Sequence, residues 1–68
     1  MQLTVEVEQE SDARWLAEIT SLPGVLAYGN TREQALERAK ALALRVLADR
    51  LDHGEPATQM DDLFAVVP

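Results

Sequence analysis

Apolar and polar residues alternate in two short stretches near the start of the chain. Residues 3–8 alternate with a period of two, which is typical of a strand with one buried face. Residues 14–19 repeat the pattern and place Trp15, Ala17 and Ile19 together on one side. The pattern therefore predicts two strands, each with one face turned toward a core.

Turn-forming residues follow each of these stretches. The polar residues 10–12 suit a hairpin turn between the two strands. Leu22-Pro23-Gly24 predicts a type II turn, because Pro presets φ at the second position and Gly accepts a positive φ at the third. Residues 25–28 then predict a short third strand that ends at Gly29.

A long helix is predicted from Thr31 to about Asp52. Thr31-Arg32-Glu33-Gln34 is a capping box, in which the Thr hydroxyl accepts from the backbone N–H of Gln34. Gly54 suits the C′ position that ends such a helix. Seven apolar residues share one stripe at helical spacing: Ala35, Leu36, Ala39, Leu42, Ala43, Val46 and Leu47.

A last apolar run, Leu63-Phe64-Ala65-Val66-Val67, predicts a fourth strand because it is short and contains β-branched residues. The chain is thus expected to be an α+β protein with the order strand-strand-strand-helix-strand. We expect an antiparallel sheet of three to four strands with one long helix on one face.

This packing leaves the second face of the sheet without a cover. Thr4, Glu6, Glu8, Arg14, Leu16 and Glu18 are expected there, joined by either Leu26 and Tyr28 or Val25 and Ala27. The candidates for binding a partner protein are Glu6, Glu8, Leu16, Glu18 and Tyr28. The alternative is that the acidic residues only keep a small domain in solution.

The helix has more apolar residues than one stripe requires. Leu44 and Leu51 lie beside Leu47 at the margin of the stripe, and these three leucines are the candidates for self-association. The alternative is that Leu44 and Leu51 widen the core under the fourth strand.

Length and charge narrow the class of protein. A chain of 68 residues is expected to form one domain with a small core, and such domains often gain stability from association. The net charge of −6 favours a basic partner and argues against direct binding of nucleic acid. Without a transmembrane run or a secretory signal, we expect a cytoplasmic protein that does not bind membranes.

The residues that carry chemistry are sparse. The chain has no Cys and one His, His53, which is expected to cap the helix. Glu6, Glu8 and Glu18 share a face on which a metal site would lack further ligands, so a solvated acidic surface is the preferred interpretation. We therefore predict no enzyme, no cofactor, no metal site and no catalytic residue.

Three motifs resemble those of the HicB-type antitoxin family. They are the strand and turn Trp15–Gly24 with its Leu-Pro-Gly, the helix start Gly29–Ala39 of the Gly-x-Thr-x-x-Glu-Ala-x-x-x-Ala type, and Gly54-Glu55-Pro56 after the helix. Gln34 stands where the family usually has Glu. The resemblance covers residues 2–56 and extends to the last strand.

The resemblance implies a partial RNase H-like fold and a role as an antitoxin. Members of the family bind and neutralise HicA, a small basic ribonuclease that cleaves mRNA, by covering its RNA-binding surface. Longer members continue into a DNA-binding segment, which is not expected here because residues 1–68 read as a single HicB-like domain. The alternative is an orphan HicB-like domain that forms homo-oligomers and has a structural or regulatory role without a toxin.

Overall fold

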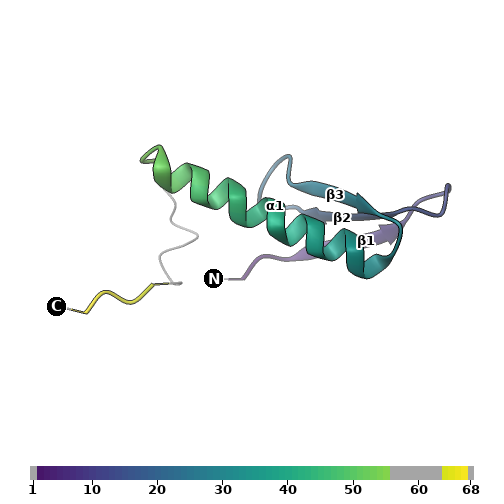
Figure 1. Ribbon diagram of the computed structural model, residues 1–68, viewed down its shortest axis with the longest axis horizontal. Helices are drawn as coiled ribbons and strands as arrows, with labels where there is room; N and C mark the ends of the chain where they lie inside the picture. Colours follow the sequence, from purple (N-terminus) through teal and green to yellow (C-terminus); the bar gives the residue numbers. More distant parts are fainter. Residues whose placement is uncertain (1, 56–63, 68) are drawn as a thin grey trace.

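The structure is a computed structural model that describes residues 2–55 and 64–67. The elements along the chain are β1 (Val5–Gln9), β2 (Trp15–Ile19), β3 (Leu26–Gly29) and α1 (Arg32–Asp52). The three strands form one sheet, and the helix lies across one face of it (Figure 1). The predicted α+β class is confirmed, as is the predicted order of three strands followed by a helix.

The strands lie in the sheet in the order of the chain, and each is antiparallel to its neighbour. Val5 lies opposite Ile19, and Val7 lies opposite Ala17. Ala17 also lies opposite Ala27 of β3. These apolar residues pack in the two clusters that α1 covers, so the alternation in the sequence gives the sheet one covered face.

The loop between β1 and β2 contains a strained residue. Glu10 N–H donates to the carbonyl of Arg14 at 2.7 Å, which closes a loop over Ser11, Asp12 and Ala13. Ala13 has φ 71°, in the left-handed region that a three-residue hairpin loop requires at its last position. Glycine is the usual residue there, and alanine costs about 1–2 kcal/mol. The turn was predicted, but its left-handed residue was not.

The second turn has the predicted geometry. Val25 N–H donates to the carbonyl of Leu22 at 3.0 Å, and Gly24 has φ 85°, as a type II turn requires at its third position. Both Leu22 and Val25 are buried. The turn therefore supplies side chains to the core as well as reversing the chain.

Both ends of α1 are capped as the sequence predicts. At the N-terminus, Gln34 N–H donates to Oγ1 of Thr31 at 3.0 Å, while Oε1 of Gln34 accepts from Asn30 N–H at 2.7 Å. The reciprocal bond thus reaches one residue beyond the usual capping box. At the C-terminus, Gly54 has φ 68°, and Glu55 N–H donates to the carbonyl of Arg50 at 2.9 Å, as in a Schellman motif.

A row of alanines lets the helix lie close to the sheet. Ala35 and Ala39 are fully buried, and Ala43 is nearly so. Gly29, at the end of β3, meets the same row: a Cβ added there would lie 2.5 Å from the backbone nitrogen of Ala35. Since backbone atoms cannot move aside as a side chain can, this position requires glycine.

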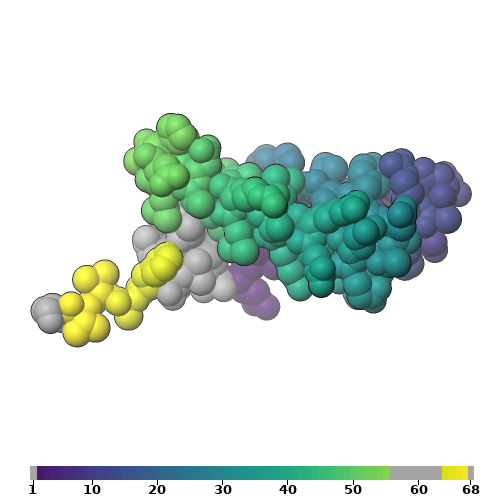
Figure 2. All heavy atoms as spheres, in the orientation of Figure 1, coloured from purple at the N-terminus to yellow at the C-terminus, as the bar shows by residue number. Residues whose placement is uncertain are grey.

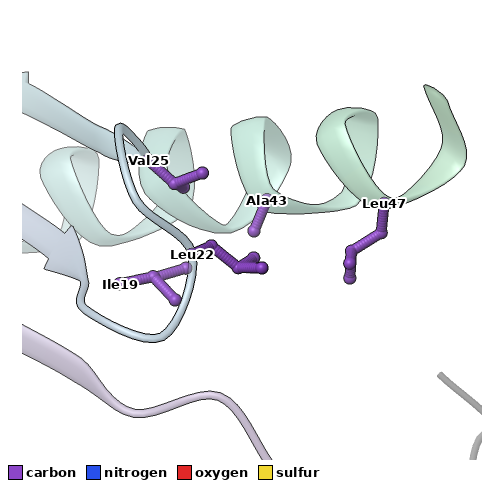
Figure 3. Packing of buried hydrophobic residues seen from close by; sticks show 5 residues of the cluster. All are labelled: Ile19, Leu22, Val25, Ala43 and Leu47. Atoms are coloured by element: carbon purple, nitrogen blue, oxygen red, sulfur yellow. The ribbon is translucent and has the colours of Figure 1, made fainter. Parts of the chain in front are cut away.

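The larger core side chains gather beside the alanine row. Figure 3 shows Ile19, Leu22 and Val25 from β2 and the following turn, facing Ala43 and Leu47 of α1. All five are at most 2% exposed. The predicted helical stripe is confirmed, with Leu36, Leu42 and Val46 half-buried along its margins.

The predicted fourth strand is wrong for residues 64–67. These residues form no strand, and Phe64, Val66 and Val67 are 67%, 93% and 83% exposed. The segment extends away from the helix and the sheet (Figures 1 and 2). A strand needs a neighbouring strand to pair with, and the β-branched composition of this run does not supply one. Leu63 lies outside the described residues.

Candidate protein-binding surface

The uncovered side of the sheet carries the candidate partner-binding residues. The residues that alternate with the buried ones point away from α1, and we call this side the open face: Glu6 and Glu8 of β1, Leu16 and Glu18 of β2, and Leu26 and Tyr28 of β3. The sequence left two choices for β3. The structure selects Leu26 and Tyr28, which are 40% and 38% exposed, while Val25 is buried.

The register of the sheet brings all five predicted partner-binding residues together. Glu6 lies opposite Glu18, Glu8 lies opposite Leu16, and Leu16 lies opposite Tyr28. A shallow hollow of about 100 Å³ is lined by Glu6, Glu8, Leu16 and Glu18, together with Val7. The candidates therefore form one continuous patch in which carboxylates border an apolar strip.

The carboxylates of the open face are not paired with any cation in the described part of the chain. Among the described residues, Glu6, Glu8 and Glu18 take part in no ion pair. Glu6 and Glu18 are also direct cross-strand neighbours, and like charges in that position destabilise a sheet. The open face therefore contributes repulsion to the folded chain, and a cation placed against it would relieve that repulsion.

Arg14 lies at the end of the open face, but its guanidinium is already engaged. The Arg14 guanidinium stacks on the Tyr28 ring, 4.5 Å from its centroid. Nε of Arg14 also donates to Oδ2 of Asp12 at 2.7 Å. The Arg14 backbone N–H also donates to Oδ1 of Asp12, at 3.1 Å. This backbone bond, together with the side-chain bond, holds the pKa of Asp12 below its ordinary value. Arg14 thus holds the loop and the ring rather than neutralising the glutamates.

The three self-association candidates divide between surface and core. Leu44 and Leu51 are 65% and 53% exposed on α1, and no strand of the described chain covers them. Leu47 is only 2% exposed and packs in the core. The helical spacing placed all three on neighbouring positions, but it could not show where the edge of the sheet falls beneath the helix.

The remaining chemical groups have local roles. Nδ1 of His53 lies 2.8 Å from the carbonyl of Asp49, at the C-terminal end of α1 where a cap was predicted. Within residues 2–55 and 64–67, no group of three or more His, Cys, Asp or Glu side chains could hold a metal ion. In the same residues, no helix is both long and apolar enough to cross a membrane.

Two contacts of Tyr28 were not predicted from the sequence. The Arg14–Tyr28 stack joins the residue just before β2 to a residue of β3, and only the register of β2 against β3 brings them together. Arg38 of α1 donates to the carbonyl of Tyr28 at 2.9 Å and ties the helix to the β3 edge. Neither contact has a signal in the local sequence, because each depends on residues far apart along the chain.

No family model matches the chain, and neither the curated proteins nor the solved structures contain a match. The likeness to HicB-type antitoxins therefore rests on the three sequence motifs.

Proposed function

We propose that this chain is an antitoxin-type protein-binding module of the HicB-like kind, with a partial RNase H-like fold. It binds a small basic HicA-like toxin that cleaves mRNA, and it neutralises the toxin by covering its RNA-binding surface. The open face is the binding surface.

The observation that carries this proposal is the unpaired charge of the open face. Glu6, Glu8 and Glu18 lie together without a cation among the described residues. Carboxylates form strong, charge-assisted hydrogen bonds with Arg and Lys. An acidic patch of this kind speeds the encounter with a basic protein and disfavours other partners. The same acidic patch repels RNA, which fits a role in displacing RNA from the toxin.

The apolar strip supplies the second requirement of a protein interface. Leu16, Leu26 and Tyr28 are only partly buried and lie side by side across β2 and β3. Tyrosine is among the residues that contribute most to binding energy when an interface excludes water around it. Because the strip lies beside the carboxylates, a partner that covers it would also shield their ion pairs from solvent.

The test is co-expression with the product of the neighbouring reading frame, followed by pull-down and a growth-rescue assay. The wild-type chain is expected to bind a short basic ribonuclease and to restore growth. The variant Glu6→Lys/Glu8→Lys/Glu18→Lys is expected to lose binding by about 100-fold or more, since close charge pairs at interfaces couple by about 1.5–7 kcal/mol.

A matched control keeps the overall charge change the same. Glu37, Asp52 and Glu55 are exposed acids outside the sheet, and their triple replacement by Lys should leave binding and rescue nearly intact. If the open-face variant still binds and rescues growth, the open face is not the toxin-binding surface. If the neighbouring frame encodes no basic ribonuclease, the antitoxin role itself is wrong.

A further inference from the structure

A second surface lies on the other side of the sheet, between the outer edge of β1 and α1. It is a groove of about 260 Å³ lined by Leu3, Val5, Ile19, Lys40, Ala43 and Leu44. Every lining residue except Lys40 is apolar. For comparison, an apolar cavity of about 150 Å³ is large enough to bind benzene. The groove is therefore large enough for an aromatic side chain and a neighbouring aliphatic one.

The groove is open because neither the helix nor the sheet supplies a side chain that fills it. On the helix, Ala43 is too small to fill the space, and Leu44, at its border, is 65% exposed. On the sheet, β1 is an edge strand that pairs only with β2 in the described part of the chain. Its outer N–H and C=O groups therefore remain available to another strand.

The same chain carries a segment whose chemistry matches the groove. Phe64, Val66 and Val67 are apolar and between 67% and 93% exposed, and we call residues 64–67 the tail. The tail extends beyond the C-terminal end of α1 and away from its own sheet (Figures 1 and 2). An apolar groove and an exposed apolar segment are thus both present in one chain without meeting.

We propose that the groove of one copy receives the tail of a second copy. The tail runs along the free edge of β1, and Phe64 enters the space beside Leu44. Because the two copies are identical, a twofold arrangement places each tail in the other copy's groove, so that both grooves are filled. The added strand uses the open hydrogen-bonding edge of β1, as in other cases of strand addition.

This interface is separate from the proposed toxin-binding surface. The groove lies on the helix side of the sheet, and the open face lies on the opposite side. Two copies joined through their tails would keep both open faces accessible. Dimerisation through the tails therefore does not depend on the antitoxin role.

Sedimentation equilibrium on the purified full chain provides the test. At about 100 µM, a concentration that populates any dimer with a micromolar dissociation constant, the chain is expected to be dimeric. Leu44→Glu, which blocks the groove, and Phe64→Glu, which disables the tail, should each weaken the dimer by 100-fold or more. Leu51→Glu is the matched control on the same helix and should leave the dimer unchanged, because Leu51 lies outside the groove.

Mixing the two variants separates tail exchange from other modes of association. The Leu44→Glu chain retains a working tail, and the Phe64→Glu chain retains a working groove. An equimolar mixture should therefore form a heterodimer with one intact junction, which neither variant forms alone. Because Leu44 and Phe64 are mostly exposed, both variants should keep the helical circular dichroism of the wild type.

Labelling gives a direct second readout. In a mixture of isotope-labelled and unlabelled wild-type chains, nuclear Overhauser effects between Phe64 of one copy and Leu44 of the other are expected. A monomer at about 100 µM would overturn the proposal, including a monomer whose tail contacts its own groove. A dimer that survives Phe64→Glu would also overturn it, since association would then not depend on the tail.

Discussion

The two faces of the sheet are built from alternate residues of the same strands, yet they differ in almost every physical respect. In β2, Ala17 and Ile19 are buried under α1, while Leu16 and Glu18 lie on the open face. The covered face carries apolar side chains without a charge, whereas the open face carries glutamates that repel one another. The contrast indicates that the covered face, rather than the open face, maintains the fold.

The largest expected effect comes from the covered side. Leu22→Ala removes a fully buried side chain and should lower the free energy of unfolding by about 2–5 kcal/mol. Leu26→Ala makes the same chemical change on the open face and should cost about 1 kcal/mol or less, because Leu26 is 40% exposed. Urea unfolding followed by circular dichroism measures both. Equal losses would show that the two sides do not differ in their contribution to stability.

The next effect tests how closely α1 approaches the sheet. Gly29→Ala places a Cβ 2.5 Å from the backbone nitrogen of Ala35, so the helix start or the end of β3 must shift. We expect a loss of about 1–3 kcal/mol, the usual cost of overpacking. Asn30→Ala, at the next and exposed position, should stay within about 0.5 kcal/mol of the wild type. Thermal unfolding of the two variants compares them, and a tolerated Gly29→Ala would contradict the close approach.

A smaller effect of opposite sign is expected on the open face. Glu18→Gln removes the repulsion with Glu6 and should raise the free energy of unfolding by about 0.2–1 kcal/mol. The gain should shrink as salt is added, because salt screens exposed charges. Glu37→Gln on α1 is the control and should give no comparable gain. A loss of stability in Glu18→Gln would mean that Glu18 has a favourable partner in the folded chain.

The smallest effect concerns Asp12, whose pKa is lowered by its hydrogen bonds from Arg14. Since the folded pKa lies below the unfolded one, the contribution of Asp12 to stability is present above about pH 4 and is lost as the pH falls through the folded pKa. The stability difference between the wild type and Asp12→Asn should therefore vanish in acid. An NMR titration of the Asp12 carboxyl checks the cause, and an ordinary pKa there would contradict it.

Much of the fold could be predicted because its signals are local. The alternation around Ala17 and Ile19, the Leu22–Gly24 turn and the Thr31 cap each depend on residues close together in the sequence. The strand predicted for the last apolar run, residues 64–67, is wrong because its formation does not depend on local signals. Phe64 and Val66 have strand-forming neighbours, but whether a strand forms depends on an edge supplied from elsewhere.

The residues of the candidate surface were predicted from the sequence, but the way they are arranged on the sheet was not. Strand alternation placed Glu6, Glu8 and Glu18 on one face, whereas the choice of Leu26 over Val25 required the observed register. The groove beside Leu44 could not be predicted, because its walls come from β1, β2 and α1 at once. Such a surface depends on how far the helix covers the sheet, which no stretch of sequence encodes alone.

The order of the strands also has a kinetic consequence. Because β1 pairs with β2 and β2 with β3, each strand pairing within residues 2–55 joins neighbours in the chain across a short turn. Short turns keep the entropy of loop closure small, and proteins rich in such contacts fold quickly. The chain is therefore expected to fold as a monomer in milliseconds or less. Tail exchange, by contrast, would appear as a later phase whose rate rises with protein concentration.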